Sequence, residues 1–221
     1  MTSHHPPDAM LLDHVAGTLP VMVDVLVATH LALCPRCRAE VAMMEAAAGK
    51  LLEETEAVAG DVDAELDALM GLLDGPLPAN TVPPAPFANA PPEALLPKPL
   101  RCVVGPSKDL AWTTSMPGAG LRVTLAEGLG GIPATLERVY PGKEVPTHGH
   151  EGPELTLVLA GGYDDPSGDY IRGDVQVVGP ETVHSLHIHD EGEDCILLSI
   201  RGGARLPKGM KARIASWIGA I

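Results

Sequence analysis

The heptapeptide His148-Gly149-His150-Glu151-Gly152-Pro153-Glu154 is the most specific motif in this sequence. His148 and His150 are two positions apart, so on a β-strand they point to one face, and Glu154 shares that face if no bulge intervenes. A buried cluster of this kind is costly unless a metal ion compensates it. His184, on a later predicted strand, is the obvious fourth ligand. Three imidazoles and one carboxylate suit Zn²⁺, Fe²⁺, Mn²⁺, Ni²⁺ or Cu²⁺, and ligand type alone does not choose among them.

The sequence around this motif predicts an antiparallel β-barrel or jelly roll from residue 100 to residue 221. Short runs of Val, Leu, Ile and Thr alternate there with Gly and Pro turns, as expected for such a fold. The predicted strands cover residues 102–105, 110–114, 121–126, 134–140, 154–159, 175–178 and 195–201. The tail, residues 210–221, is expected to pack on the barrel as a helix or a last strand. Alternation along the strand that carries His184 points it inward and places His187 and His189 on the surface.

A second candidate metal site lies far upstream. His30 and Cys34 are one helical turn apart, and Cys37 follows by three residues, which supplies three ligands of a tetrahedral Zn²⁺ site. The alternatives are a pair of cysteines that are merely buried and a redox dithiol, but a thioredoxin-like dithiol motif follows a strand, and none is predicted here. The fourth ligand is sought among the other histidines near the first predicted helix, with His5 preferred over its neighbour His4 and His14 weaker than both.

The first third of the chain is predicted to be helical. The predicted helices run from Asp8 as N-cap to Gly17, from Pro20 to about Leu33, from Arg36 to about Glu56 and from about Val62 to Leu73. The last of these helices carries an apolar stripe at helical spacing, formed by Leu66, Leu69, Met70 and Leu73. This stripe is interpreted either as a core face of the domain or as a surface that binds a partner.

Composition divides the chain and limits its functions. Nine prolines between residues 75 and 99 predict a semi-rigid linker, so the expected domains are 1–75 and 100–221, with 76–99 between them. The net charge is −14, and residues 1–75 carry three basic against thirteen acidic side chains, which disfavours direct nucleic-acid binding and favours a basic protein surface. The longest apolar run, 19–33, is too short to span a bilayer and no signal peptide is evident, so a soluble cytoplasmic protein is expected.

The motif residues resemble the cupin family. Gly142, the heptapeptide and Gly161 match its complete first motif. The second motif is degraded: Gly173 is present and His184 stands where its histidine belongs, but three positions depart from the usual Pro, Gly and Asn, namely Gly179, Glu181 and Ile188. The resemblance therefore implies a metal-bearing cupin barrel in which the ligands are retained and the turn chemistry differs. The alternative is a metal-free barrel in which these side chains form a hydrogen-bonded polar cluster.

Together, the helical His-Cys-Cys segment and the cupin segment resemble the ChrR family of zinc-dependent anti-sigma factors over nearly the whole chain. The stretches that carry this resemblance are 5–11, 27–38, 152–159 and Asp194-Cys195. The resemblance implies two zinc sites, the first at His5, His30, Cys34 and Cys37 and the second at His148, His150, Glu154 and His184. Cys195 lies either near the second metal or in the core as a structural thiol.

The same resemblance implies the function. The helical domain is expected to bind and inhibit an extracytoplasmic-function sigma factor as a one-to-one heterodimer, and the cupin domain to serve the response to singlet oxygen or other oxidants. One alternative is a cupin-type dioxygenase or isomerase with an N-terminal regulatory domain. It is disfavoured because no further polar constellation would position a substrate, so no enzymatic activity is expected. A second alternative is a metal-responsive binding module that regulates something other than a sigma factor.

Overall fold

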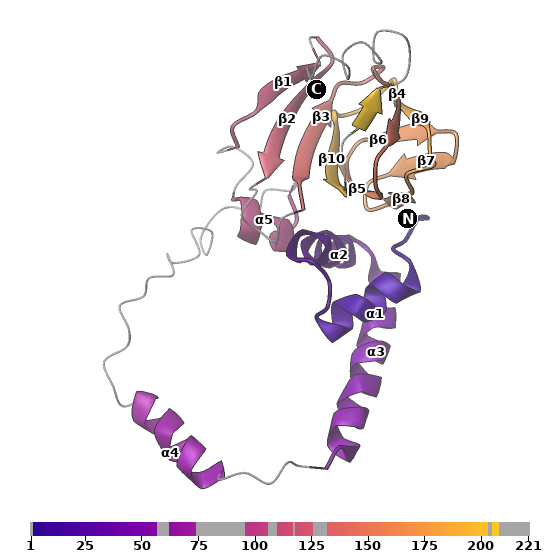
Figure 1. Cartoon of the computed structure of the whole chain (residues 1–221). Helices are drawn as coiled ribbons and strands as arrows, with labels where there is room; N and C mark the ends of the chain where they lie inside the picture. Colours follow the sequence, from indigo (N-terminus) through magenta and orange to yellow (C-terminus); the bar gives the residue numbers. More distant parts are fainter. Residues whose placement is uncertain are drawn as a thin grey trace.

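The computed structural model describes residues 2–56, 62–73, 96–105, 110–116, 118–125, 132–202 and 205–207. Most of the predicted linker and the tail 210–221 lie outside these residues. Three helices, α1 (Asp8–Ala16), α2 (Val21–Leu33) and α3 (Pro35–Glu54), follow one another closely in the first part of the chain (Figure 1). Gly17 ends α1 in the left-handed conformation, at φ 66°, as its sequence position predicts. Asp8 is the first residue of α1 and not its cap, because Pro7 occupies the N-cap position.

The helix α4 (Val62–Leu73) has the predicted bounds, and Figure 1 draws it apart from the other elements. The helix α5 (Lys98–Val104) corrects the prediction of a strand at 102–105. Pro97 is the N-cap of α5 and Pro99 lies in its first turn, where the missing amide hydrogens are tolerated. Leu100 of this helix is fully buried in the core, so tertiary packing overrides the strand preference of Val103 and Val104.

After α5, the described residues form two antiparallel sheets, which confirms the predicted antiparallel β domain. One sheet has six strands in the order β1-β2-β3-β10-β5-β8, and the other has five in the order β11-β4-β9-β6-β7. The strands of the first sheet are Thr113–Met116, Gly120–Leu125, Ala134–Val139, Cys195–Arg201, Glu154–Ala160 and Val175–Val178. Those of the second sheet are Arg205–Pro207, Glu144–His150, His184–Ile188, Gly162–Asp165 and Gly168–Ile171.

The six-stranded sheet is covered on both faces. Along β10, Leu197 faces an apolar cluster that includes residues of the five-stranded sheet, among them Leu186. The neighbouring Leu198 faces the opposite way, into a cluster that contains Leu26 of α2 and Leu100 of α5. Since strand side chains alternate, this double burial explains why six of the seven residues of β10 are buried.

The helices and the β domain therefore meet in one continuous apolar core. Met22, Val23 and Leu26 of α2 lie in the same cluster as Leu157 and Ile200 of the sheet. The first three helices have a smaller core of their own, which contains Cys34 and Cys37. Among the described helices none is by itself long and apolar enough to cross a membrane, and only α1 and α2 together, bent by 111°, satisfy the length and composition criteria.

Candidate metal centres

The structure brings together the four residues that the resemblance assigns to the first site. His5 precedes α1, His30 lies in the last turn of α2, Cys34 is the junction residue and Cys37 lies in the first turn of α3. One potential ligand atom from each lies within 4.8 Å of the others. Nδ1 of His5 is 3.3 Å from Sγ of Cys37 and 3.5 Å from Sγ of Cys34. Two imidazoles and two thiols in this arrangement form the donor set of a tetrahedral zinc site.

The other two histidines considered for this site are placed elsewhere. His4 stacks its ring on Tyr170, with ring centroids 4.3 Å apart. His14 pairs with Asp24, with Nδ1 2.6 Å from Oδ1. Neither belongs to the group of ligand atoms around the two cysteines.

The pKa values of the two thiols in this cluster are shifted in opposite directions. For Cys34, burial acts to raise the pKa, but hydrogen bonds from the amide of Cys37 and the hydroxyl of Thr2 outweigh it and lower the pKa. For Cys37, burial raises the pKa to about 12, and the hydrogen bond to Cys34 acts in the same direction. Because two adjacent buried thiolates repel each other, a bound cation is needed for both to ionise.

His30 provides a direct test of whether the cluster fits a metal. Its Nδ1 is 2.7 Å from the carbonyl oxygen of Gly173, so Nδ1 carries the proton and donates it to that oxygen. Its Nε2 is buried and, within the described part of the chain, has no hydrogen-bond partner. Burial lowers the pKa of His30, which keeps the ring neutral. A neutral imidazole with one fixed nitrogen and a free, buried lone pair fits a metal ligand.

The second cluster lies between the two sheets. His148 of β4 is directly opposite His184, the first residue of β9, in the antiparallel register. Nε2 of His150 is 3.1 Å from Nε2 of His184, and Glu154 completes a group of four buried residues with ligand atoms within 4.8 Å. Glu154 begins β5 instead of continuing β4, because Gly152 and its neighbours form a turn. The four side chains therefore meet as expected, but Glu154 reaches the cluster from the next strand, β5, and not by alternation along β4.

Each candidate ligand of the second cluster is held by a further contact. Nδ1 of His148 lies 2.9 Å from the carbonyl oxygen of Pro146, and Nδ1 of His184 lies 2.9 Å from Oδ2 of Asp165. Glu154 places Oε2 3.2 Å from Nδ1 of His150. Such contacts fix imidazole orientation and leave the ε nitrogens of His148 and His184 as the metal-facing atoms, so the residues present fit a bound metal ion.

Two residues that support this cluster were not identified from the sequence. Asp165 also accepts hydrogen bonds from Ser167 and Gln176, and these bonds together with His184 lower its pKa although burial acts to raise it. Arg201 donates from Nε to Oε1 of Glu154 over 2.5 Å. Neither residue belongs to a motif, and only the pairing of strands brings them to the site.

The remaining residues of interest near the second cluster lie outside it. His187 is exposed and His189 is half-buried, which agrees with the predicted outward alternation. His189 forms a third, exposed group with Asp164 and Asp169. Cys195 is fully buried in the core between the sheets and is absent from the group of candidate ligand atoms. Cys195 starts β10, and Arg201, which contacts Glu154, ends it. About 20 Å of strand therefore separates Cys195 from the end of β10 that reaches the second cluster.

Apolar side chains are exposed on α3 and α4. Leu66, Leu69 and Met70 of the predicted stripe are 51–57% exposed and belong to none of the apolar core clusters of the described residues. Leu73 lies at the end of α4, and its side chain is outside the described part. Leu51 and Leu52, near the end of α3, are also exposed. Contiguous exposed apolar side chains of this kind are typical of binding surfaces.

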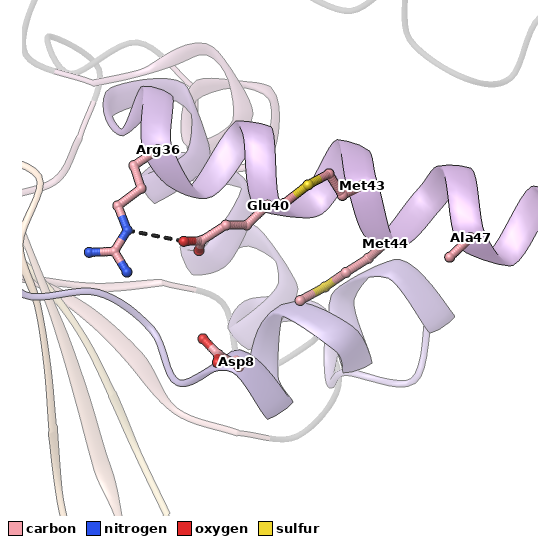
Figure 2. A pocket seen from close by; sticks show the side chains of 6 residues that line it. All are labelled: Asp8, Arg36, Glu40, Met43, Met44 and Ala47. Atoms are coloured by element: carbon pink, nitrogen blue, oxygen red, sulfur yellow. Dashed lines mark hydrogen bonds and ion pairs between the residues drawn. The ribbon is translucent and has the colours of Figure 1, made fainter.

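A groove of about 400 Å³ lies between α1 and α3. Figure 2 shows its lining, in which Met43 and Met44 lie along α3 and Asp8 lies across from α3 at the start of α1. An ion pair between Arg36 and Glu40, with Nε 3.0 Å from Oε1, borders its upper end in the view. Methionine side chains adapt their shape to a partner, so this groove is a second candidate docking surface on the same helix.

Comparisons with known proteins agree on one family. The domain described as the ChrR cupin-like domain matches residues 101–203. The anti-sigma-E factor ChrR of Cereibacter sphaeroides is 37% identical over 211 residues, which cover 93% of this chain and 94% of that protein. The crystal structure of Rhodobacter sphaeroides SigE in complex with the anti-sigma ChrR is similar with a TM-score of 0.75 and 35% identity, covering 91% of this chain and 99% of the other.

Proposed function

Because this chain belongs to the ChrR family of anti-sigma factors, we propose that it binds an extracytoplasmic-function sigma factor and holds it inactive as a one-to-one complex in the cytoplasm. The observation that carries this proposal is the similarity along almost the full length of both chains, helices and β domain together. The relative of that length is an anti-sigma factor, so the protein is a regulator and not an enzyme.

The exposed faces of α3 and α4 would hold the sigma factor. Leu69 and Met70 of α4 and Leu52 of α3 supply apolar area, which is the main source of affinity when a helix binds a groove or a partner helix. The surrounding charge is acidic, since residues 1–75 carry thirteen acidic side chains. An acidic rim would speed association with a basic sigma surface and would not attract DNA directly.

Zinc is the metal proposed for the first cluster, and for the second it is preferred over the other divalent metals. A bound zinc ion supplies a cross-link between chain segments that cannot bury much apolar surface alone. In the first cluster the protein holds His5, His30 and the two cysteines at the junction of three helices, whose own buried core is small. The angle between α2 and α3, and with it the direction in which α3 presents Leu51 and Leu52, would then depend on this centre.

The β domain is proposed to serve the response to singlet oxygen or other oxidants. Its candidate metal ligands include three imidazoles, and imidazoles are oxidisable side chains. Because α2 shares an apolar core with the six-stranded sheet, a change in the packing of the sheet would reach the helices directly. Replacing His148 and Glu154 by Ala should then alter sigma release under oxidant, and unchanged release would count against this role.

The proposed function is tested by co-purification with the sigma factor and by transcription with purified RNA polymerase. The full chain should form a one-to-one complex and block sigma-dependent transcription. The double variant Leu69→Asp/Met70→Asp should weaken the complex at least about tenfold, because it places two charges in the apolar contact. A matched control is Val177→Asp, an exposed apolar position on β8. Failure of the unaltered protein to bind any sigma factor would overturn the proposal.

A further inference from the structure

We propose that the turn joining β7 to β8 in the β domain, residues 172–174, together with Val175, is the outer coordination shell of the first metal centre. The centre would then reach its full metal affinity only while the helical segment is docked on the β domain. This inference rests on the proposed assignment of a metal to the first cluster. It adds that two parts of the chain, separated by the linker, build one centre jointly.

The first contact is the one that fixes His30. Its Nδ1 donates to the carbonyl oxygen of Gly173 over 2.7 Å, across 143 residues of sequence. The partner of the second ring nitrogen sets the tautomer and the angle of a metal-bound imidazole. For His30 that partner belongs to the β domain. If the domains separate, the ring loses the acceptor that directs its Nε2 toward Cys34 and Cys37.

The second set of contacts fixes the segment that carries His5. The carboxylate of Asp174 is fully buried, and its Oδ1 accepts the amides of Ser3 at 2.7 Å and His4 at 3.0 Å. The amide of Val175 donates to the carbonyl oxygen of His4 over 3.1 Å. The residue immediately before His5 is thus held through both its amide and its carbonyl group, so the backbone position of this ligand is set by the β domain.

The third contact is the close approach at Gly173. Its φ is +97°, a conformation that side chains disfavour, and a Cβ built there would lie 2.5 Å from Cγ2 of Thr2. The same Cβ would lie 3.4 Å from Cβ of Leu33. Thr2 in turn donates from its hydroxyl to Sγ of Cys34 over 3.3 Å. A glycine is therefore required for the turn to reach the ligand-bearing segments on both sides.

The same contacts extend to the second centre. Asp165, which holds Nδ1 of His184, also accepts the amide of Ser167 at 2.7 Å. The hydroxyl groups of Ser167 and Tyr170 are 2.9 Å apart, and the ring of Tyr170 stacks on His4. The outer contacts of both centres thus share the β6–β7 hairpin. Because the two centres share these contacts, we expect that losing a ligand of the second centre loosens the first.

Cobalt substitution tests this inference in the full-length protein. Thiolate ligands give Co²⁺ intense near-ultraviolet absorption that histidine and carboxylate ligands do not, so the first centre can be followed alone. The rate of cobalt loss to an excess of chelator is measured for Asp174→Asn and Gly173→Ala. An asparagine cannot accept from Ser3, His4 and Ile171 at once, because one of its two terminal atoms is a donor. The matched control is Asp190→Asn, at an exposed carboxylate of the same domain.

Asp174→Asn and Gly173→Ala should each lose the thiolate-bound cobalt about tenfold faster than the unaltered protein, the usual size of an outer-shell effect. The control should match the unaltered protein. If both variants lose cobalt at the same rate as the unaltered protein, the proposal is overturned. His184→Ala should accelerate the loss by a smaller factor, and an unchanged rate would overturn the link to the second centre.

These results are distinguishable from failure of the proposed function. A protein that binds no sigma factor but shows accelerated cobalt loss in Asp174→Asn would overturn the function and support the inference. If the unaltered protein shows no thiolate-to-cobalt absorption, both the metal assignment and the inference are overturned.

Discussion

The guanidinium of Arg201, at the end of β10, binds the carboxylate of Glu154, at the start of β5, with Nε 2.5 Å from Oε1. The same guanidinium places Nη2 3.0 Å from Oε1 of Glu137, on the neighbouring strand β3. All three side chains are buried or nearly so. Burial acts to lower the pKa of Arg201, but the two carboxylates outweigh it and raise the pKa. Arg201 thus supplies a buried positive charge beside Glu154, the carboxylate of the second metal cluster.

Replacing Arg201 by Met should cost about 3–5 kcal/mol in the free energy of unfolding, because it removes the guanidinium from the buried carboxylate of Glu154. Glu137 keeps its ion pair with Arg122, whose Nη2 lies 3.0 Å from Oε1. The measurement is chemical denaturation at neutral pH. The control is Arg138→Met, which breaks an ion pair to Asp194 with Nε 2.6 Å from Oδ2. That pair is partly exposed, so its loss should cost about 0–1 kcal/mol. Equal losses in the two variants would contradict the charge-balancing role of Arg201.

The helix boundaries could be predicted because proline and glycine mark them locally. Gly17 ends α1 by adopting a left-handed conformation, and Cys34-Pro35 separates α2 from α3. The strand predicted at 102–105 was wrong for a tertiary reason. Leu100 is buried against α2 and the sheet, and this burial outweighs the local preference of the two valines that follow.

The candidate ligands could be predicted because their spacing is local, whereas their supporting contacts could not. His148 and His150 lie in one motif, but Arg201 reaches Glu154 across 47 residues. Gly173 reaches His30 across 143 residues. Periodicity and motif spacing describe neighbours along the chain and contain no information on such pairings. The shared core of α2 and the six-stranded sheet escaped prediction for the same reason.

The two metal centres should be separable by stoichiometry. The unaltered chain is expected to hold about two zinc ions, one per tetrahedral ligand set. Cys37→Ser and His148→Ala should each reduce the zinc content by about one ion per chain, measured by elemental analysis after gel filtration. Cys102→Ser is the matched control for Cys37→Ser, since Cys102 is an exposed cysteine on α5. Loss of both ions in His148→Ala alone would show that the centres are not separable.

The helices and the β domain should unfold as one cooperative unit because they share a core. Leu26 of α2 is fully buried in that core, and Leu26→Ala should cost about 2–5 kcal/mol. The loss should appear equally when unfolding is followed by helical circular dichroism and by tryptophan fluorescence, to which Trp112, packed against the same core, contributes. Leu51→Ala, at a position that is 68% exposed, should change stability by less than about 0.5 kcal/mol. Two separate transitions in the unaltered protein would contradict this prediction.

The stability of the whole fold should decrease at alkaline pH because of Cys195. Burial raises the pKa of this thiol from 9.0 to about 12. The folded protein therefore keeps a proton that the unfolded chain releases above pH 9, so the contribution of Cys195 is fully present below pH 9 and is lost as the pH rises toward 12. The expected loss is about 1.4 kcal/mol for each pH unit in that window.

Cys195→Ala isolates this contribution, because alanine cannot titrate while the other groups remain. The difference in unfolding free energy between the unaltered protein and the variant should be constant from pH 7 to pH 8.5. It should then shrink by about 2 kcal/mol by pH 10.5. Iodoacetamide at neutral pH provides an independent check, since the buried Cys195 should stay unmodified in the native state while the exposed Cys102 reacts. A difference that stays constant up to pH 10.5 would mean that the thiol ionises with equal ease in the folded and unfolded chain.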